Sequence, residues 1–334
     1  MARKTEISGE IIKSYLERFP NAGALTLARK VYAENPSVWK DVESVRGKIR
    51  YYIGQHGKAH RKDITDTRFM RPAGNPYYIP ESDCIPWEPV HIPERLNSGL
   101  IFSDTHFPYH DVNAISAMID YTVGHRKINF ILINGDGIDF YQCSRFNKDP
   151  RNRSVSNEIW MFIEFLNILK STFEGVKIYF KLGNHDERLE KYLRVKAPEL
   201  MDMNEFKLDE ILKIRGMDDI TVIERQIVYI GRLPFLHGHE MYGGASSPVN
   251  PARGLFLKTL SSAVTSHLHR SSAHSETDVN EKLMSWYSIG CLCGLHPEYA
   301  LINKWNHGFS LIQTEGKEFE FHNMKIYQGK VYTD

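Results

Sequence analysis

The sequence predicts an α/β protein preceded by a small all-helical module. From about residue 98 onward, short apolar runs alternate with segments of helical spacing, which is typical of strands joined by helical crossovers. The first 70 residues show helical spacing only. Six of the 15 prolines lie between Pro72 and Pro93 and separate the two parts. We therefore expect a basic helical module over 1–71, a proline-rich linker or strap over 72–96, and an α/β domain over 97–334.

The composition of the 334-residue chain is that of a globular protein, with 42% hydrophobic and 25% charged residues. This excludes a disordered or fibrous protein. No apolar run reaches the ~18–20 residues that span a bilayer, and the first residues lack the apolar core of a signal peptide. We expect a cytoplasmic protein with no membrane partner. The four cysteines predict no disulfide framework, and Cys291 and Cys293 are expected to be buried packing residues.

The net charge of +1 hides an asymmetry between the two parts. Residues 1–71 hold 15 Lys and Arg against 8 Asp and Glu, a net charge of +7, whereas residues 72–334 hold 27 against 33, a net charge of −6. A basic module joined to an acidic body favours a polyanionic partner such as nucleic acid. An ordinary solvated surface explains the same charge equally well.

Three helices are expected in the module. The first carries apolar residues from Ile11 to Phe19, and the second carries them from Leu25 to Tyr32. The third is expected to follow Ser37 as its N-cap and to end at Gly54. Its basic residues suit a helix-turn-helix module that binds DNA or RNA. Any small three-helix bundle that docks on a protein gives the same pattern. Nucleic-acid binding and protein docking therefore both stay open as interpretations of the module.

In the α/β domain the apolar runs predict the order of the strands. Helices are expected over 111–123 and 156–171, and strands over 99–103, 128–134, 176–182, 228–230, 235–236, 263–265 and in three or more segments after 283.

Polar side chains that can bind metals follow five of these strands. The five groups are Asp104 and His106; Asp136 and Asp139; Asn184 and His185; His237; and His267 and His269. In open α/β sheets, ligands bind beyond the carboxyl ends of the strands, so the groups can converge on one point. Carboxylate, imidazole and amide ligands suit Mn, Fe or Zn. A single His or Asp at a strand end is more often a cap or a surface residue, but five such groups in order favour a metal site.

In this order, the motifs resemble those of the calcineurin-like metallophosphoesterases over roughly residues 97–334. They are Asp104-x-His106, Gly135-Asp136-x-x-Asp139, Gly183-Asn184-His185-Asp186, His237-Gly238 and Ser266-His267-x-His269. The resemblance implies a four-layer αββα sandwich. Ser266 stands where the family usually has Gly, which fits if that turn does not need a positive φ. Phe140 stands where protein Ser/Thr phosphatases carry Arg, which argues against that branch. The arrangement also resembles phage and bacterial phosphoesterases with an N-terminal helical segment.

The resemblance implies two divalent cations that share one ligand and attack of a metal-bridged hydroxide on phosphorus. One cation would be held by Asp104, His106, Asp136 and His269, and the other by Asp136, Asn184, His237 and His267. Mn is expected to support activity in vitro. His185 would protonate the leaving oxygen as general acid, and Asp139 would orient it, the alternative for Asp139 being a helix N-cap. The sequence assigns no role to His239.

The substrate is expected to be a phosphodiester in nucleic acid, because of the basic module and two basic segments beside the site. Arg145 and Arg151 lie in one segment and Arg188 in the other, and all three are expected to contact phosphates. The alternative is solvated surface charge. A small-molecule phosphoesterase acting on nucleotides, cyclic nucleotides or phosphomonoesters is the competing enzyme. An inactive nucleic-acid-binding or scaffold protein is less favoured, because every expected ligand type is present.

Overall fold

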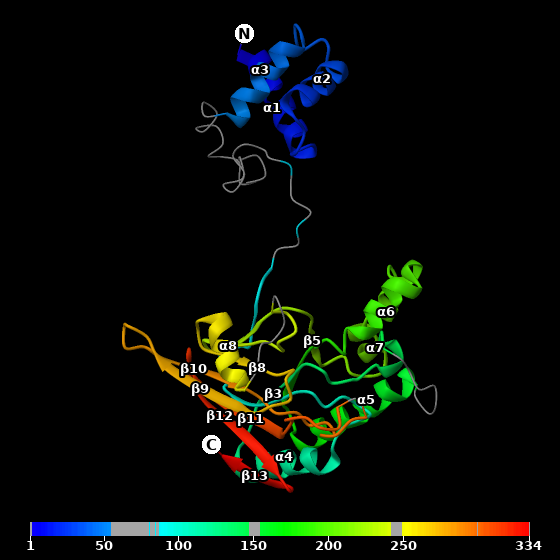
Figure 1. Cartoon of the computed structure of the whole chain (residues 1–334). Helices are drawn as coiled ribbons and strands as arrows, with labels where there is room; N and C mark the ends of the chain where they lie inside the picture. The colour runs from blue at the N-terminus through cyan, green and yellow to red at the C-terminus, as the bar shows by residue number, and fades with distance from the viewer. Residues whose placement is uncertain are drawn as a thin grey trace. The chain divides into compact units, whose positions relative to one another are not determined.

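The computed structural model describes residues 2–54, 80, 84, 87–146, 154–241, 249–298 and 300–333. The chain divides into two compact units, Met1–Ile85 and Pro86–Asp334. The division falls inside the proline-rich stretch 72–96. Arg151 and most of that stretch, including Tyr77 and Tyr78, lie outside the described residues. The elements follow one another from blue to red in Figure 1.

The first unit is helical, as predicted. Its helices are α1 (Ala2–Arg18), α2 (Ala24–Glu34) and α3 (Val42–Ile53). They bury one apolar face each, and the core they form includes Ile12, Leu27, Val31, Val45 and Ile49. Helices α2 and α3, with 11 and 12 residues, are too short to be stable alone, so the shared core holds the unit together.

The expected N-cap of the third helix is wrong. The helix begins at Val42, and Asp41 is its cap, because the Asp41 carboxylate accepts both the backbone N–H and the hydroxyl of Ser44 at 2.7 Å. Ser37 lies in the preceding turn. The connection between α2 and α3, residues 35–41, is longer than the three or four residues of a helix-turn-helix turn.

The second unit contains two sheets in its described part. The seven-stranded sheet has the order β13-β12-β11-β2-β3-β4-β5, and the six-stranded sheet has the order β1-β6-β7-β8-β10-β9. The strands of the first are β2 (Ser98–Phe102), β3 (Phe130–Asn134), β4 (Lys177–Lys181), β5 (Thr221–Ile223), β11 (His307–Glu315), β12 (Glu318–Tyr327) and β13 (Lys330–Thr333). Those of the second are β1 (Val90–His91), β6 (Val228–Ile230), β7 (Leu233–Phe235), β8 (Ala263–Thr265), β9 (Ser272–Thr277) and β10 (Leu283–Ser288).

Parallel pairing aligns the strand ends that carry the predicted ligands. β2, β3 and β4 are parallel neighbours in one sheet, and β7 and β8 are parallel neighbours in the other. Strands β3 and β4 are almost fully buried, which explains the apolar runs Phe130–Ile133 and Ile178–Phe180 within them. The loops after these five strands therefore leave the sheets at their carboxyl ends.

The helices cover the outer faces of the two sheets. Helices α4 (Val112–His125) and α5 (Val155–Thr172) pack on the seven-stranded sheet, where Phe102, Phe162 and Phe180 share one core. A second core lies between the sheets and joins Phe130 and Leu132 to Val228 and Phe235. Helix α8 (Pro251–Thr259) packs near Trp286 on the six-stranded sheet. Figure 1 shows α4 and α8 on opposite sides of the sheets. The predicted four-layer αββα sandwich is confirmed.

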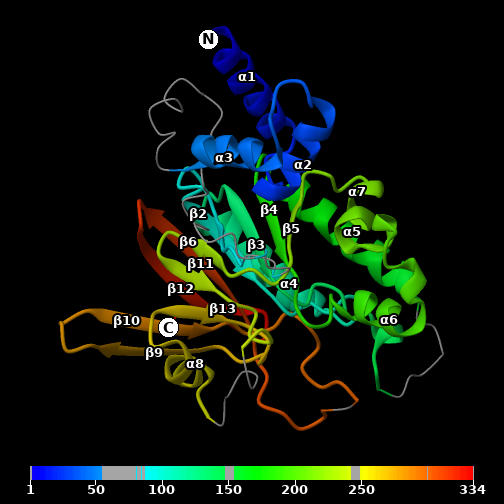
Figure 2. The same ribbon diagram turned by 90° about the horizontal axis from the view of Figure 1, so that it is seen from above.

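Several elements had no counterpart in the sequence prediction. Strand β1 lies in the predicted linker and pairs in parallel with β6. The others are β5, β9, α7 (Leu208–Ile214), α8 and three short 3₁₀ helices: η3 (Tyr141–Cys143), η4 (Pro198–Leu200) and η5 (Asn204–Phe206). Helix α6 (Arg188–Lys196) forms where the basic residues after Asp186 have near-helical spacing. Figure 2 shows α6 and α7 beside α5 in the second unit. None of the helices in the described residues is long and apolar enough to cross a membrane.

Candidate metal centre

The five strand-end loops bring the predicted ligands together. Asp104 and His106 follow β2, Asp136 follows β3, Asn184 follows β4, His237 follows β7, and His267 and His269 follow β8. Three of the loops leave the seven-stranded sheet and two leave the six-stranded sheet, so the cluster lies at one end of the sandwich where both sheets contribute.

The first group surrounds His106 and His269. Nε2 of His269 lies 3.1 Å from Oδ1 of Asp104 and 3.2 Å from Nε2 of His106. Nε2 of His106 lies 3.7 Å from Oδ2 of Asp136. Ligand atoms of Asp104, His106 and Asp136 are close enough to bind one metal ion. These four residues are the set that the sequence predicted for the first cation.

The second group shares Asp136 with the first. Nε2 of His237 lies 3.2 Å from Oδ2 of Asp136, and ligand atoms of Asp136, His237 and His267 are close enough to bind one ion. The amide oxygen of Asn184 is buried and has no hydrogen-bond partner in the described part of the chain. A buried acceptor without a donor is costly, and a cation at this point would satisfy it.

The backbone is strained where the ligands lie. Of the nine non-glycine residues with positive φ in the described residues, five are predicted ligands: Asp104 (54°), His106 (47°), Asp136 (55°), His267 (68°) and His269 (55°). Such conformations cost free energy and concentrate at functional sites. Ser266 is not among them, so the serine fits the turn, and its buried hydroxyl accepts a hydrogen bond from Nδ2 of Asn134 at 2.8 Å.

Charges within the cluster are strongly coupled. Burial opposes ionisation of Asp136, but the facing imidazoles, His237 above all, hold the pKa of this carboxyl well below its usual range. Burial lowers the pKa of His237, but the carboxylates, above all Asp136, raise it to about 10. For His267, burial and the charge of His237 lower the pKa to about 4. Buried carboxylates that face several imidazoles form a donor set that fits divalent cations of the Mn, Fe or Zn type.

His185 and Asp139 form a pair beside the cluster. Nδ1 of His185 lies 2.7 Å from Oδ1 of Asp139, and Nδ1 of His106 lies 3.3 Å from the same oxygen. Burial opposes ionisation of Asp139, but hydrogen bonds with His106 and His185 hold the pKa of Asp139 far below its usual range. Asp139 therefore joins a predicted ligand to the predicted general acid. That Asp139 orients His185 stays a prediction, and so does the role of His185 as the general acid.

Arg188, predicted to contact phosphate, is held against this pair. Nη1 of Arg188 donates to the backbone oxygen of Asp139 at 2.8 Å and lies 3.2 Å from its Oδ2. Nη2 donates to Nε2 of His185 at 2.9 Å. Arg145 is exposed, with its guanidinium carbon 5.2 Å from the centre of the Phe146 ring. Contacts of these arginines with phosphate stay predictions.

Asp186 is a structural residue of the site to which the sequence assigned no role. Its buried carboxylate accepts the backbone N–H groups of Asp136 (2.7 Å), Ile138 (2.9 Å) and Gly183 (2.8 Å). Burial and the nearby Asp136 carboxylate raise the pKa of Asp186 to about 8. Gly183 packs so closely that a Cβ there would lie 2.2 Å from Oδ1 of Asp136. Asp186 and Gly183 thus fix the loop of the shared ligand.

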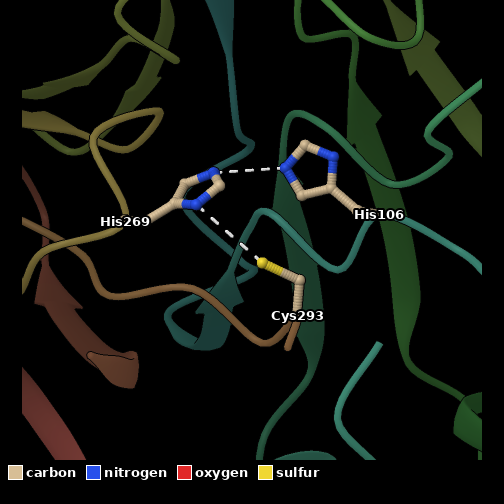
Figure 3. Close-up of side chains that lie close together, drawn as sticks. All are labelled: His106, His269 and Cys293. Carbon is tan, nitrogen blue, oxygen red and sulfur yellow. Dashed lines mark hydrogen bonds between the residues drawn. The ribbon is translucent and has the colours of Figure 1, made fainter. Parts of the chain in front are cut away.

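Cys293 lies against one of the predicted ligands. Figure 3 shows His269 between His106 and Cys293, with one ring nitrogen toward each. Sγ of Cys293 lies 3.8 Å from Nδ1 of His269, and the Trp305 ring packs on the same imidazole with the ring centres 4.1 Å apart. Cys291 and Cys293 are buried, as the sequence predicted. No sequence signal pointed to the contact with His269, because the two residues come from different loops.

His239, which had no assigned role, is mostly buried behind His237. The two ring centres are 5.3 Å apart, and Nε2 of His239 lies 3.5 Å from Oε1 of Glu187. The described residues do not place it in any of the groups that could hold a metal ion.

A four-layer sandwich whose strand ends hold two His and Asp groups with a shared aspartate defines a metallophosphoesterase domain. The sequence model of the calcineurin-like phosphoesterases matches residues 100–304. Because this match covers more than half of the chain, the protein belongs to the calcineurin-like phosphoesterase family, which uses divalent metals. The resemblance seen in the sequence is confirmed.

Solved structures with a similar fold include Vps29 proteins. Vacuolar protein sorting 29 from Cryptosporidium parvum is 17% identical, with 71% of this chain and 95% of that chain covered and a TM-score of 0.40. Wild-type Vps29 with Zn²⁺ from Entamoeba histolytica is 11% identical, with coverage of 71% and 97% and a TM-score of 0.38. Vps29 from Chaetomium thermophilum is 12% identical, with coverage of 71% and 96% and a TM-score of 0.40. A search of curated proteins finds no match.

Proposed function

We propose that the protein hydrolyses phosphodiester bonds in nucleic acid with two divalent cations. The observation that carries this proposal is the position of Asp136, which belongs to both groups of ligands and lies beside the His185–Asp139 pair. A carboxylate shared between two ion positions, next to an imidazole that can act as an acid, suits the hydrolysis of a phosphate ester by two metal ions.

The chain's own residues would hold the cations as two sets. Asp104, His106 and His269 complete one set, Asn184, His237 and His267 complete the other, and Asp136 belongs to both. When bound, two divalent cations acidify water and withdraw charge from the phosphate. Nδ1 of His237 lies 2.8 Å from the carbonyl oxygen of Asn134, which fixes the ring so that Nε2 faces Asp136.

The proton for the leaving group would come from His185, and Asp139 and Arg188 would control its transfer. Asp139 accepts a hydrogen bond from Nδ1 of His185 and stabilises the protonated ring. The guanidinium of Arg188 donates to Nε2 of His185, the atom that must deliver the proton. A phosphate oxygen binds a guanidinium strongly, so the bound substrate would draw Arg188 away and free Nε2 of His185 to carry and donate a proton.

The choice of nucleic acid rests on the charge of the first unit. Residues 1–71 carry a net charge of +7, and two of the basic residues, Lys40 just before α3 and Arg50 within it, are exposed. A basic module attached to a phosphodiesterase would raise the local concentration of a polyanionic substrate.

Metal dependence is tested with bis-p-nitrophenyl phosphate and Mn²⁺. We expect hydrolysis that stops after chelation and returns with Mn²⁺. Asp136→Ala is expected to abolish hydrolysis and lower the number of bound cations, whereas Asp202→Ala, at an exposed aspartate, is the control. Hydrolysis that persists in Asp136→Ala or after exhaustive chelation contradicts the proposal.

The substrate is tested on the full chain with single- and double-stranded DNA and RNA, and with mononucleotides. Lys40→Glu combined with Arg50→Glu should weaken nucleic-acid cleavage while leaving bis-p-nitrophenyl phosphate hydrolysis unchanged. Lys282→Glu with Lys330→Glu, at exposed positions of the second unit, is the matched control. Turnover of mononucleotides alone would favour the small-molecule enzyme. Nucleic-acid binding without any hydrolysis by the metal-loaded protein would favour the scaffold.

A further inference from the structure

A buried ion pair lies behind the ligands of the second group. Lys181 is the last residue of β4, and its side chain is fully buried. Its Nζ lies 2.7 Å from Oε1 of Glu240 and donates to the backbone oxygen of Gln226 at 3.0 Å. A lysine is almost never buried without a partner, so the Glu240 carboxylate must offset the loss of hydration.

The Glu240 carboxylate also binds the turn that carries His237. Oε1 accepts the backbone N–H of His237 at 3.0 Å, and Oε2 accepts the backbone N–H of Gly238 at 2.6 Å. Gly238 has a φ of 126°, a conformation that side-chain residues rarely adopt. The carboxylate therefore stabilises an unusual turn whose first residue is a predicted ligand.

The pair connects the two sheets at the ligands. Lys181 precedes Asn184 by three residues on the seven-stranded sheet, and Glu240 follows His237 by three residues on the six-stranded sheet. Asn184 and His237 are predicted ligands of the second cation only. Among the described residues, the hydrogen bonds and ion pairs of Lys181 and Glu240 join them to each other, to Gln226 and to residues 237–239, and not to Asp104, His106 or His269.

We propose that Lys181 and Glu240 are positioning residues that hold Asn184 and His237 in place for the second cation. This inference rests on the proposed function, because it assumes two cation positions. The pair sets the separation of two loops from different sheets, and Glu240 fixes the peptide plane that aims His237 at Asp136. The first cation position does not depend on the pair.

The test compares Mn²⁺ binding by the full chain and three variants. The variants are Lys181→Met, Glu240→Gln and the double variant, and calorimetry measures the affinity of each bound Mn²⁺. We expect all three variants to bind the second Mn²⁺ at least about tenfold more weakly, with the affinity for the first unchanged. Magnetic coupling between two Mn²⁺ ions, seen by electron paramagnetic resonance, should be lost with the second ion.

The double variant separates a positioning role from a merely structural one. Each single variant leaves one charge buried without a partner and is destabilised for that reason, whereas the double variant buries none. In the double variant an amide faces the N–H groups of His237 and Gly238, so we expect a folded protein that still binds the second Mn²⁺ weakly. Leu169→Ala, on the buried face of α5, is the control for lost stability alone.

Three outcomes overturn the inference: normal affinity for both ions in the double variant, an equal loss of both affinities, or fewer than two ions bound by the unmodified chain. The proposed function fails separately. If the unmodified chain binds two Mn²⁺ but hydrolyses no phosphodiester, the activity is refuted while the positioning role stands on the binding data.

Discussion

The imidazole of His185 contacts two groups of opposite charge, one at each nitrogen. Nδ1 lies 2.7 Å from the Asp139 carboxylate, and Nε2 accepts a hydrogen bond from the Arg188 guanidinium at 2.9 Å. The Asp139 carboxylate accepts the hydrogen bond from Nδ1, and Arg188 occupies the lone pair of Nε2. For the proposed acid role, Arg188 must therefore move away before Nε2 can carry a proton to the leaving group.

His185→Ala should slow poor leaving groups far more than good ones. An alkoxide needs a proton as it departs, and nitrophenolate does not, so the loss in kcat should be about 10²–10⁴-fold for an alkyl phosphodiester and much smaller for a nitrophenyl ester. Steady-state kinetics on both esters measure the difference. Equal losses for the two esters would contradict the acid role.

Arg188→Lys should lower kcat/KM by about tenfold or more, because one ammonium cannot replace the two-pronged contact of a guanidinium with the substrate phosphate that draws Arg188 away from His185. Added guanidinium should restore part of the rate in Arg188→Ala. Arg194→Ala, on the same helix but paired with Glu190, is the control. Unchanged kinetics in Arg188→Ala would show that the arginine takes no part in the reaction.

Gly183→Ala should remove metal binding. The added Cβ would lie 2.2 Å from Oδ1 and 2.5 Å from the backbone nitrogen of Asp136, so the shared ligand must move. Metal analysis after Mn²⁺ loading and dialysis should find less than the two ions of the unmodified chain. Gly124→Ala, in α4 with open space around it, should bind metal normally and gain about 0.5–1 kcal/mol of stability. Normal Mn²⁺ content in Gly183→Ala would contradict the close packing.

The stability of the protein should fall between pH 5 and 8, and Glu158→Gln should abolish this fall. Burial, with a smaller contribution from the Asp139 carboxylate, raises the pKa of Glu158 to about 7, so the folded protein holds a proton that the unfolded chain releases above about pH 4.5. Stability therefore falls as pH rises through this window, by at most about 3 kcal/mol. Denaturant unfolding at several pH values measures the slope. Glu164→Gln, at an exposed position on the same helix, should leave this pH dependence of stability unchanged. If the pH dependence persists in Glu158→Gln, another group causes it.

The sequence predicted the central strands and the convergence of the ligands for one reason. In a sheet buried on both faces, strands are continuous apolar runs, so the polar residue that ends each run marks a carboxyl end. Asp104, Asp136 and Asn184 could be placed from this rule alone. The rule says nothing of which loop then folds over the site.

What the sequence missed depends on contacts between distant loops. Arg188 has the spacing of a surface helix, yet it contacts the His185–Asp139 pair because α6 begins directly beside the site. Cys293 meets His269 only after the chain returns from β10. Asp41 rather than Ser37 caps α3, since both residue types cap helices and local pattern does not rank them.

Strand β1 limits where the chain can be shortened. Val90 and His91 form the edge strand of the six-stranded sheet and pair with β6, and Ile92 is buried in the core between the sheets. Removing the helical unit by cutting after this strand would leave β6 with unpaired N–H and C=O groups beside exposed apolar surface, which invites aggregation. A catalytic fragment should therefore begin before Val90, and insolubility of a shorter one would say nothing about the role of the helices.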